Sequence, residues 1–433
     1  MPILPGDARG PRRFVDSTLV TAYLDHAATT PMRTRAVEAL TRELTRTGNA
    51  SSLHASGRAA RRTVEESRER LAAALGARPS EVLWTAGGTE ADNLAVKGIY
   101  WSRRAQDRAR RRILVSAVEH HAVLDPAFWR AGHEGAEIVQ LPVDSEGMVD
   151  LDALRAELEA SGDQTALVSV MWANNEVGTV QPLADVVALA RRHGVPVHAD
   201  AVQAVGQLHV DFAASGRAAM TVSGHKVGGP HGVGALLARR GLALTPVLHG
   251  GGQERGIRSG TLDAPAIASF AVALAEAVLA QGEHAARVAT LRDELVARVR
   301  DAVPGAVLRG PTSADGPSSA PRRLPANAHF TFDGCEGDSL LYLLDSAGVE
   351  CSTGSACQAG VLQPSHVLLA MGVDERDARG ALRFSLGHTS TTGDVDALIA
   401  ALPEAVDRAR AAGLSSVSQG AAGRAVVGDG PAR

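Results

Sequence analysis

Short apolar runs alternate with longer amphipathic stretches up to about Pro265. Each run is short enough for a buried strand. Helices are predicted over Arg58–Leu75 and Leu183–His193, because a glycine and then a proline follow each stretch and end the helical pattern. This alternation predicts an open α/β fold with a mostly parallel sheet and helices on both faces. The predicted strands are Val82–Thr85, Ile113–Ala117, Glu137–Leu141, Ala166–Met171, Val195–Ala199, Ala218–Val222 and Val233–Ala238.

The rhythm of the pattern changes after about Pro265. A long helical stretch is followed by residues 310–325, rich in Pro, Ser and Gly, and then by short strands and helices that end near residue 412. We therefore predict a large domain over residues 23–264 and a smaller α+β domain over residues 265–412, with 310–325 as a surface loop. Residues 1–22 and 413–433 are predicted to be a flexible extension and a disordered tail, because they show little apolar periodicity.

Composition is typical of a soluble globular protein and argues against a general affinity for polyanions. Of the 433 residues, 45% are hydrophobic and 21% are charged, and the net charge is −4 at pH 7. The arginine-rich segment Arg103–Arg112 includes Asp107 and precedes a strand-like run. We interpret it as a solvated helix end or loop, and we expect no direct binding of nucleic acid.

Cysteine usage and the N-terminus indicate a reducing, cytoplasmic setting. The chain has three cysteines, Cys335, Cys351 and Cys357, and this odd number leaves at least one thiol unpaired. The N-terminal residues lack the apolar core of a signal peptide. The most apolar long stretch, Ala264–Ala280, is interrupted by a proline and a glutamate, so we predict a buried helix and no membrane span.

A lysine and an aspartate follow two predicted strands and suggest chemistry with an aldehyde cofactor. Lys226 lies in SGHKVGGPHGVG, whose five glycines would let the backbone approach a ring and a phosphate. Lysine forms a Schiff base only when its amine can lose a proton. Asp200 lies in VPVHADAVQAVG at the end of an apolar strand, where a bare carboxylate is costly unless it is paired. It could hold a pyridine nitrogen protonated while Gln203 reaches a phenolic oxygen, or cap a helix, or do both.

Polar residues after other predicted strands could complete a ring and phosphate site. TAGGTEADN places Gly88 and Thr89 between a strand and a helix, where N–H groups converge on a phosphate, although a glycine turn with a threonine cap is an alternative. His120 in VEHHAVLD could stack on a ring or be a polar loop residue. Asn175 in WANNEVGTVQP could bind a substrate or build a turn. Their shared place at strand ends favours one ligand site at the carboxyl edge of the sheet.

The loop STGSACQAG, residues 352–360, carries Cys357 among small residues. Such a loop could move a thiol between a cofactor and an acceptor. The thiolate is the attacking form, so a nearby cation or a polar site should lower the pKa of Cys357. Cys335 and Cys351 are interpreted as buried small hydrophobic residues.

Taken together, these segments resemble the cysteine desulfurases of the NifS/IscS type. The resemblance implies a fold-type I transferase of the class V aminotransferase family that depends on pyridoxal 5′-phosphate and acts as a homodimer. It gives no role to His26. The motifs, which span about Tyr23 to Leu386 in the family's order, are YLDHAATTP, NASSLHASGR, TAGGTEADN, VEHHAVLD, NNEVGTVQP, HADAVQAVG, SGHKVGGPHG, HGGGQERGIRSGTL, STGSACQAG and LRFSLG.

The resemblance also implies a role for each matching residue. Lys226 would bind the aldehyde of the cofactor, Asp200 would pair with its ring nitrogen, and Gln203 would bind its phenolic oxygen. His120 would stack on the ring and relay protons, and Cys357 would be the nucleophile. The remaining implied residues are Gly88, Thr89, Ser223 and His225 at the phosphate, Asn175 and Arg383 at the substrate carboxylate, and Arg258 and Thr261 at the partner subunit's site.

The implied reaction converts L-cysteine to L-alanine. Lys226 would remove the α-proton, and Cys357 would attack the substrate sulfur and keep it as a persulfide. The sulfur would pass to an acceptor for iron–sulfur cluster assembly or for thiolation of tRNA or DNA. The long loop between Cys351 and Arg383 resembles that of members with protein acceptors. The Ala/Gly/Ser tail after residue 412 lacks the docking segment with which housekeeping members bind a U-type scaffold.

Three alternatives remain at this stage. A selenocysteine lyase or an aminotransferase could use the same cofactor and fold, but transamination has no use for Cys357. A metal-binding module could use Cys351, Cys357 and His366, although their spacing fits no compact zinc motif and we expect no metal.

Overall fold

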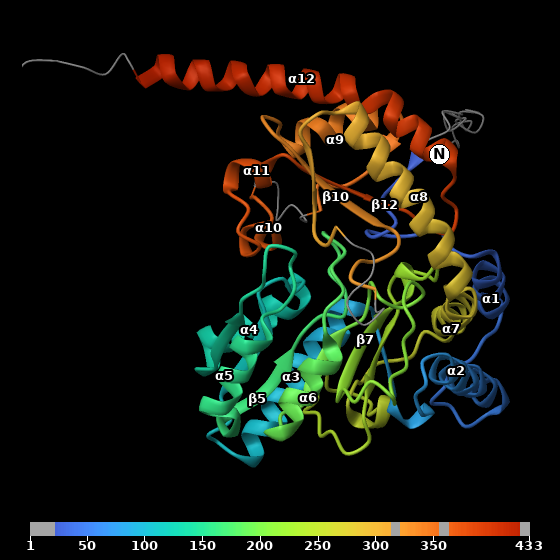
Figure 1. Cartoon of the computed structure of the whole chain (residues 1–433). Helices are drawn as coiled ribbons and strands as arrows, with labels where there is room; N and C mark the ends of the chain where they lie inside the picture. Colours follow the sequence, from blue (N-terminus) through green and yellow to red (C-terminus); the bar gives the residue numbers. More distant parts are fainter. Residues whose placement is uncertain (1–21, 313–320, 355–362, 425–433) are drawn as a thin grey trace, which may run out of the picture.

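A seven-stranded sheet forms the centre of the larger part of the molecule (Figure 1). The computed structural model describes residues 22–312, 321–354 and 363–424. The strand order is β2-β8-β7-β6-β5-β3-β4, and β8 alone runs antiparallel to its neighbours. The predicted mostly parallel sheet is confirmed, and all the predicted strands belong to it. They are β2 (Val82–Thr85), β3 (Arg112–Ser116), β4 (Glu137–Leu141), β5 (Thr165–Ser169), β6 (Val197–Asp200), β7 (Ala219–Ser223) and β8 (Gly234–Ala238).

Alternate strand residues pack against helices on opposite faces of this sheet. In β2, Val82 and Trp84 share a core with α1, α2 and α7, whereas Leu83 shares another core with α3 and α4. Leu114 of β3 packs with α5 and α6. Helices therefore cover both faces, as predicted. They are α1 (Thr34–Leu44), α2 (Ala55–Ala74), α3 (Gly88–Gln106), α4 (His121–Glu134), α5 (Leu151–Ser161), α6 (Leu183–Arg192) and α7 (Ala264–Leu279).

A three-stranded antiparallel sheet of order β12-β10-β9 forms the centre of the smaller part (Figure 1). The rings of Phe330 and Phe384 are fully buried there, with their centroids 6.4 Å apart. Helices α8, α9 and α12 contribute to the same core. The elements are β9 (Ala306–Arg309), β10 (Asn327–Phe332), β12 (Ala381–Ser385), α8 (Gln281–Ala302), α9 (Gly337–Ser346), α10 (His366–Ala370), α11 (Glu375–Arg379) and α12 (Thr392–Arg424).

The first strand packs with the C-terminal part of the chain. β1 (Ala22–Tyr23) pairs in parallel with β11 (Val349–Glu350), and Leu24 is buried in the core of the smaller part. The chain therefore enters the larger part after Leu24 and before α1, later than the predicted boundary at residue 23. The sequence pattern missed this because a two-residue strand has no periodicity.

The predicted C-terminal boundary also differs from the structure. Helix α12 continues to Arg424, past the end at residue 412 that the fading apolar pattern predicted. The last residues of the predicted tail, 425–433, and almost all of the predicted extension 1–22 lie outside the described residues.

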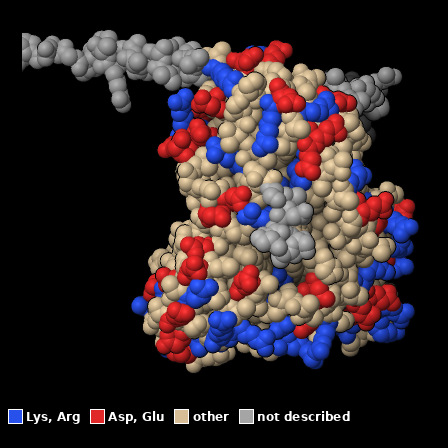
Figure 2. All heavy atoms as spheres, viewed as in Figure 1, with Lys and Arg blue, Asp and Glu red and all other residues tan. Residues whose placement is uncertain are grey.

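Two local predictions need correction. Arg112 is 6% exposed in β3, where it binds Glu137 at 2.8 Å and Glu157 at 2.6 Å, so it is paired and buried instead of solvated. Leu324, near the end of segment 310–325, is buried in the core under α7, although residues 313–320 lie outside the described residues. Basic and acidic side chains are interspersed over the face drawn in Figure 2.

Helix α7 is largely buried, as predicted for Ala264–Ala280. Among the described residues no single helix is long and apolar enough to cross a membrane, and α7 and α8 meet that measure only as a pair bent by 71°. Cys335 and Cys351 are buried and unpaired, which confirms their interpretation as small core residues.

Candidate active site

A cavity of about 420 Å³ lies at the carboxyl edge of the seven-stranded sheet, where the smaller part of the chain meets it. The smaller part contributes Ser352, Gly354 and Arg383 to its wall. Thr261 does not line the cavity, and Cys357 lies outside the described residues. The cavity brings together the predicted site residues Gly88, Thr89, His120, Asn175, Asp200, Gln203, Ser223, His225, Lys226 and Arg383.

Lys226 follows β7 at the end of a short turn, Gly224–Lys226. Its Nζ donates hydrogen bonds to the carbonyl oxygens of Ala27, at 2.6 Å, and Ala28, at 2.7 Å. Burial, followed by the positive charge of Arg383, lowers the pKa of Lys226 to about 8. The amine can therefore lose its proton near neutral pH, which is what a Schiff-base lysine requires.

This pKa gives a testable pH dependence for the uptake of pyridoxal phosphate by the cofactor-free protein. Only the neutral amine attacks an aldehyde, and its fraction rises about tenfold per pH unit below the pKa. We expect the uptake rate to rise with pH to about 8, the pKa of Lys226, and then to level off. Absorbance after rapid mixing measures it. A rate that stays flat from pH 6 to pH 9, roughly one unit or more on either side of that pKa, would contradict the assignment.

Asp200 ends β6, with its carboxyl group buried in the cavity. Its Oδ1 accepts a hydrogen bond from the backbone N–H of Val202 at 2.8 Å, so the turn after the strand fixes its orientation. Burial raises the pKa of Asp200 to about 6, and the nearby charge of Lys226 opposes this rise. A protonated pyridine nitrogen would supply the cation that a buried carboxylate needs. Gln203 is also buried here, and its Nε2 donates to the carbonyl of Ala27 at 2.9 Å.

His120 precedes α4 and caps it. Its Nδ1 accepts a hydrogen bond from the backbone N–H of Ala122 at 3.1 Å, so the neutral ring carries its proton on Nε2. Burial, and then the charge of Lys226, lowers the pKa of His120 to about 4. His120 can therefore act both as a polar residue of the loop and as a group that stacks on a ligand ring. One ring nitrogen caps the helix while the side chain lines the cavity.

Helix α3 begins at Gly88, shortly after β2 ends at Thr85, and its first residues, Gly88 and Thr89, line the same cavity. The first N–H groups of a helix lack partners within it and can bind a phosphate. A Cβ atom at Gly88 would lie 3.1 Å from Cγ2 of Val202, so a side chain there would crowd the cavity wall. Thr89 and Ser223 line this end, and His225 lies 3.3 Å from the hydroxyl of Thr29. These small and polar groups form a cradle suited to a phosphate.

The residues present fit pyridoxal phosphate. A neutralisable amine, a buried carboxylate, an imidazole and a helix N-terminus line one cavity, and these are the groups that its aldehyde, ring nitrogen, ring face and phosphate require. The chain contains only two lysines, and the other one, Lys97, does not line the cavity. Lys226 is therefore the only side-chain amine available there.

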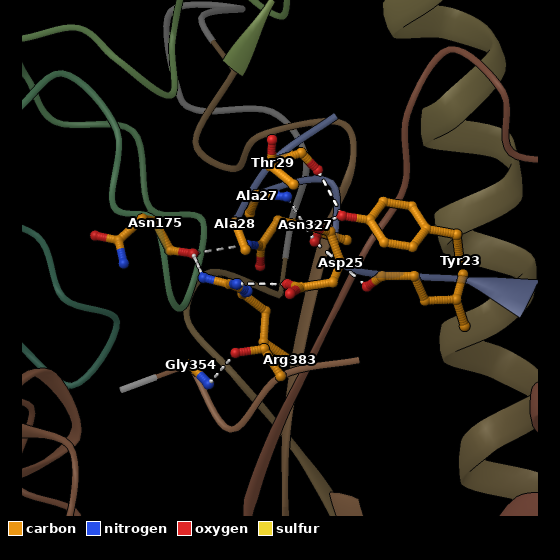
Figure 3. Close-up of polar contacts among 12 residues, drawn as sticks. Tyr23, Asp25, Ala27, Ala28, Thr29, Asn175, Asn327, Gly354 and Arg383 are labelled. Carbon is orange, nitrogen blue, oxygen red and sulfur yellow. Dashed lines mark hydrogen bonds and ion pairs between the residues drawn. The ribbon is translucent and has the colours of Figure 1, made fainter. Parts of the chain in front are cut away.

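Arg383 of β12 reaches the cavity from the smaller part (Figure 3). Its Nη2 donates to Oδ1 of Asp25 at 2.7 Å, and its Nη1 donates to the backbone carbonyl of Asn175 at 2.9 Å. The side-chain amide of Asn175 points away from the guanidinium. Asn174 instead builds the turn, because its Oδ1 accepts the N–H groups of Glu176 and Val177.

Thr261 is exposed and does not line this cavity. The same loop carries Arg258, whose Nε donates to Glu90 Oε1 at 2.7 Å. Glu254 and Arg255 have φ of 46° and 60°, in the left-handed region that non-glycine residues rarely adopt. The buried Arg68 donates two hydrogen bonds to the carboxylate of Glu254, at 2.9 and 2.6 Å, which hold the loop in that form.

The sequence reasoning missed two buried acids that line the cavity, Glu176 and Asp92. Glu176 accepts a 2.5 Å hydrogen bond from Ser365, and Asp92 lines the wall 3.5 Å from His198 Nε2. Burial raises the pKa of both carboxyl groups. The nearby charge of Asp200 raises the pKa of Asp92 further. Their only sequence signal was their place in motifs after strand ends. His366, considered as a metal ligand, instead lines the cavity.

A metal centre finds no support in the described ranges, where no group of three His, Cys, Asp or Glu side chains converges. Cys351 is buried in the core of the smaller part, and burial raises the pKa of its thiol to about 12. His366 Nε2 is also engaged, by the backbone carbonyl of Glu119 at 2.9 Å.

Comparison with known proteins adds independent findings. Residues 22–398 match the family Aminotransferase class-V. An IscS-like cysteine desulfurase of Mycobacterium tuberculosis is 58% identical over 395 residues, which are 91% of this chain and 98% of that protein. A solved NifS-like protein has a TM-score of 0.80 at 34% identity and covers 89% of this chain and 99% of its own. SspA, solved in complex with cysteine, has a TM-score of 0.70 at 30% identity, with coverages of 85% and 99%.

Proposed function

Since the chain belongs to the class-V aminotransferases and, within them, to the IscS-like cysteine desulfurases, we propose that it removes sulfur from L-cysteine through the residues of the cavity described above. The observation that carries the proposal is that Lys226, Asp200 and Arg383 line the same cavity. Each serves a different part of an amino-acid substrate and its cofactor. Pyridoxal phosphate, when bound, supplies the electron sink that makes the bond breaking possible.

Lys226 and Asp200 have different roles: Lys226 transfers protons, and Asp200 provides a negative charge for the cofactor ring. Lys226, with its pKa lowered to about 8, takes the α-proton of the substrate and later returns a proton to carbon. Asp200, as a carboxylate, would pair with the ring nitrogen of the bound cofactor and favour its protonated form. His120 carries its proton on the nitrogen that is not bonded to Ala122, which leaves Nε2–H as a donor in the cavity.

Arg383 binds the carboxylate of the substrate. Its side chain is 4% exposed and lines the cavity, and the planar guanidinium can bind a carboxylate through two parallel hydrogen bonds. Asn175 also lines the cavity, and the group that it presents to Arg383 is its backbone carbonyl. This arrangement favours an amino acid as the substrate, because Arg383 would bind its carboxylate while its amine would react with the cofactor held at Lys226.

Cys357 receives the sulfur. Its thiolate attacks the substrate sulfur, so that an S–S bond forms while the C–S bond breaks, and the carbon fragment keeps the electron pair, gains a proton and leaves as alanine. The persulfide then passes to a protein acceptor, for which iron–sulfur cluster assembly is the destination we propose from the IscS-like relative. We further propose that the enzyme acts in the cytoplasm as a homodimer, in which Arg258 and Thr261 reach the partner subunit's site.

Product analysis tests this function. With L-cysteine and a thiol reductant, the purified holoenzyme should form one alanine and one sulfide per cysteine consumed. An aminotransferase would instead give a keto acid and no sulfide. A selenocysteine lyase would show a kcat/KM for selenocysteine far above that for cysteine, so parallel assays with both amino acids separate the alternatives.

A further inference from the structure

One short turn, residues 25–29, holds both Arg383 and Lys226. Figure 3 shows the Arg383 side of this turn, where Asp25 faces the guanidinium. At its start, Asp25 Oδ1 accepts from Arg383 Nη2 at 2.7 Å. Two residues on, the carbonyl oxygens of Ala27 and Ala28 accept from Lys226 Nζ at 2.6 and 2.7 Å. The turn, residues 25–29, therefore connects the group proposed to bind the substrate carboxylate with the group proposed to bind the cofactor.

The turn is fixed from several sides. The hydroxyl of Tyr23 donates to the carbonyls of Asp25, at 3.2 Å, and Thr29, at 2.8 Å. The N–H of Ala27 donates to Ser385 Oγ at 2.9 Å, and β1 anchors the preceding residues on β11. These contacts fix the backbone of the turn, so the carboxylate that projects from it at Asp25 has a defined position relative to β12, which carries Arg383.

Arg383 depends on this carboxylate because the guanidinium is buried. Only 4% of its side chain is exposed, whereas 20% of that of Asp25 is exposed. A buried charge without a counter-ion is costly. A guanidinium has five N–H donors, and Asp25 and the carbonyl of Asn175 take one each. Within the described residues Nε has no partner, so unused donors remain for a ligand in the cavity that Arg383 lines.

We propose that Asp25 is a positioning residue for the substrate: it orients the Arg383 guanidinium so that its unused donors face the substrate carboxylate. The proposal rests on the proposed function, since it gives Arg383 its ligand. It assigns a role to the aspartate of YLDHAATTP that sequence reasoning left without one. Asp25 does not touch the reacting atoms and acts through Arg383.

The opposite role makes the opposite prediction. If Asp25 instead competed with the substrate for Arg383, removing its charge would tighten the binding of carboxylate ligands. If Asp25 positions Arg383, removing its charge weakens the binding of carboxylate ligands and leaves the binding of amines that lack a carboxylate unchanged. The sign of the change and its dependence on the ligand therefore separate the two roles.

The test compares L-alanine with ethylamine, which differs from alanine only by the carboxylate. Dissociation constants are read from the absorbance of the bound cofactor in the holoenzyme. Asp25→Asn, which keeps the shape of the side chain, should raise the constant for L-alanine about tenfold, the order expected for weakening one charge-assisted contact, and leave that for ethylamine unchanged. Asp25→Ala should do the same and serves as the second variant if Asn impairs folding.

Two further variants show whether the effect runs through Arg383. Glu350→Gln removes an acid from β11 near the turn without touching Arg383 and should change neither constant. In an Arg383→Lys background, Asp25→Asn should cause no additional loss.

Each remaining outcome overturns a defined claim. An unchanged or lowered constant for L-alanine, or an equal rise for ethylamine, would overturn the positioning role of Asp25. Failure of the wild-type enzyme to desulfurate cysteine, with its alanine and ethylamine constants measurable, would instead overturn the proposed function.

Discussion

Replacing Lys226 with alanine should lower kcat for cysteine desulfuration by about 10²- to 10⁴-fold, the range typical for loss of a positioned acid or base. Lys226 is the only side-chain amine that lines the cavity, and burial lowers its pKa to about 8, so no other group can both bind the aldehyde and move the α-proton. The variant should still take up pyridoxal phosphate weakly, through Asp200 and the start of α3. Steady-state kinetics with alanine detection measures the loss.

Lys97 provides the matched control. It is the only other lysine in the chain, and its Nζ lies 5.3 Å from the centroid of the Trp129 ring, away from the cavity. Lys97→Ala should keep kcat within a factor of about two, as is usual for a residue that makes no contact with reacting groups. Comparable losses in both variants would show that the assay responds to general damage.

Cys357→Ser should abolish the transfer of sulfur to the enzyme. A serine hydroxyl is a poor nucleophile toward sulfur at neutral pH, whereas a thiolate attacks it readily. The variant should keep its cofactor spectrum and its dissociation constant for L-alanine, because the groups proposed to bind the cofactor and the substrate carboxylate belong to described residues that the substitution leaves in place. Alanine formation from cysteine is the readout.

The two other cysteines test the specificity of this loss. Cys335 and Cys351 are buried, and burial raises the pKa of both thiols, so neither should accept sulfur. Cys335→Ala should retain the desulfuration rate. Full activity of Cys357→Ser with cysteine and a thiol reductant would remove Cys357 from the nucleophile position.

Strand and helix positions in the larger part could be predicted from the sequence because their signal is local. Apolar runs of four to six residues gave β2 and β4 with the bounds that the structure has. Asp200 and Lys226 could be placed at strand ends for the same reason, and parallel strands bring such ends to one edge.

Features that depend on distant contacts could not be predicted. β1 has two residues and no periodicity, and its partner β11 lies more than 300 residues away. The ion pair of Asp25 with Arg383 joins residues 358 apart in sequence, so no local pattern marks it. Arg112 looked solvated in an arginine-rich segment, because its partners Glu137 and Glu157 are supplied by other elements.

Reductive trapping of the cofactor on the protein tests the central claim most directly. Borohydride treatment of the holoenzyme, followed by proteolysis and mass spectrometry, fixes the cofactor to the amine that holds it. Since the chain has two lysines, only two side-chain outcomes exist. Modification of the peptide that contains Lys226 is the predicted result. Modification of Lys97, or of no lysine at all, would contradict the account.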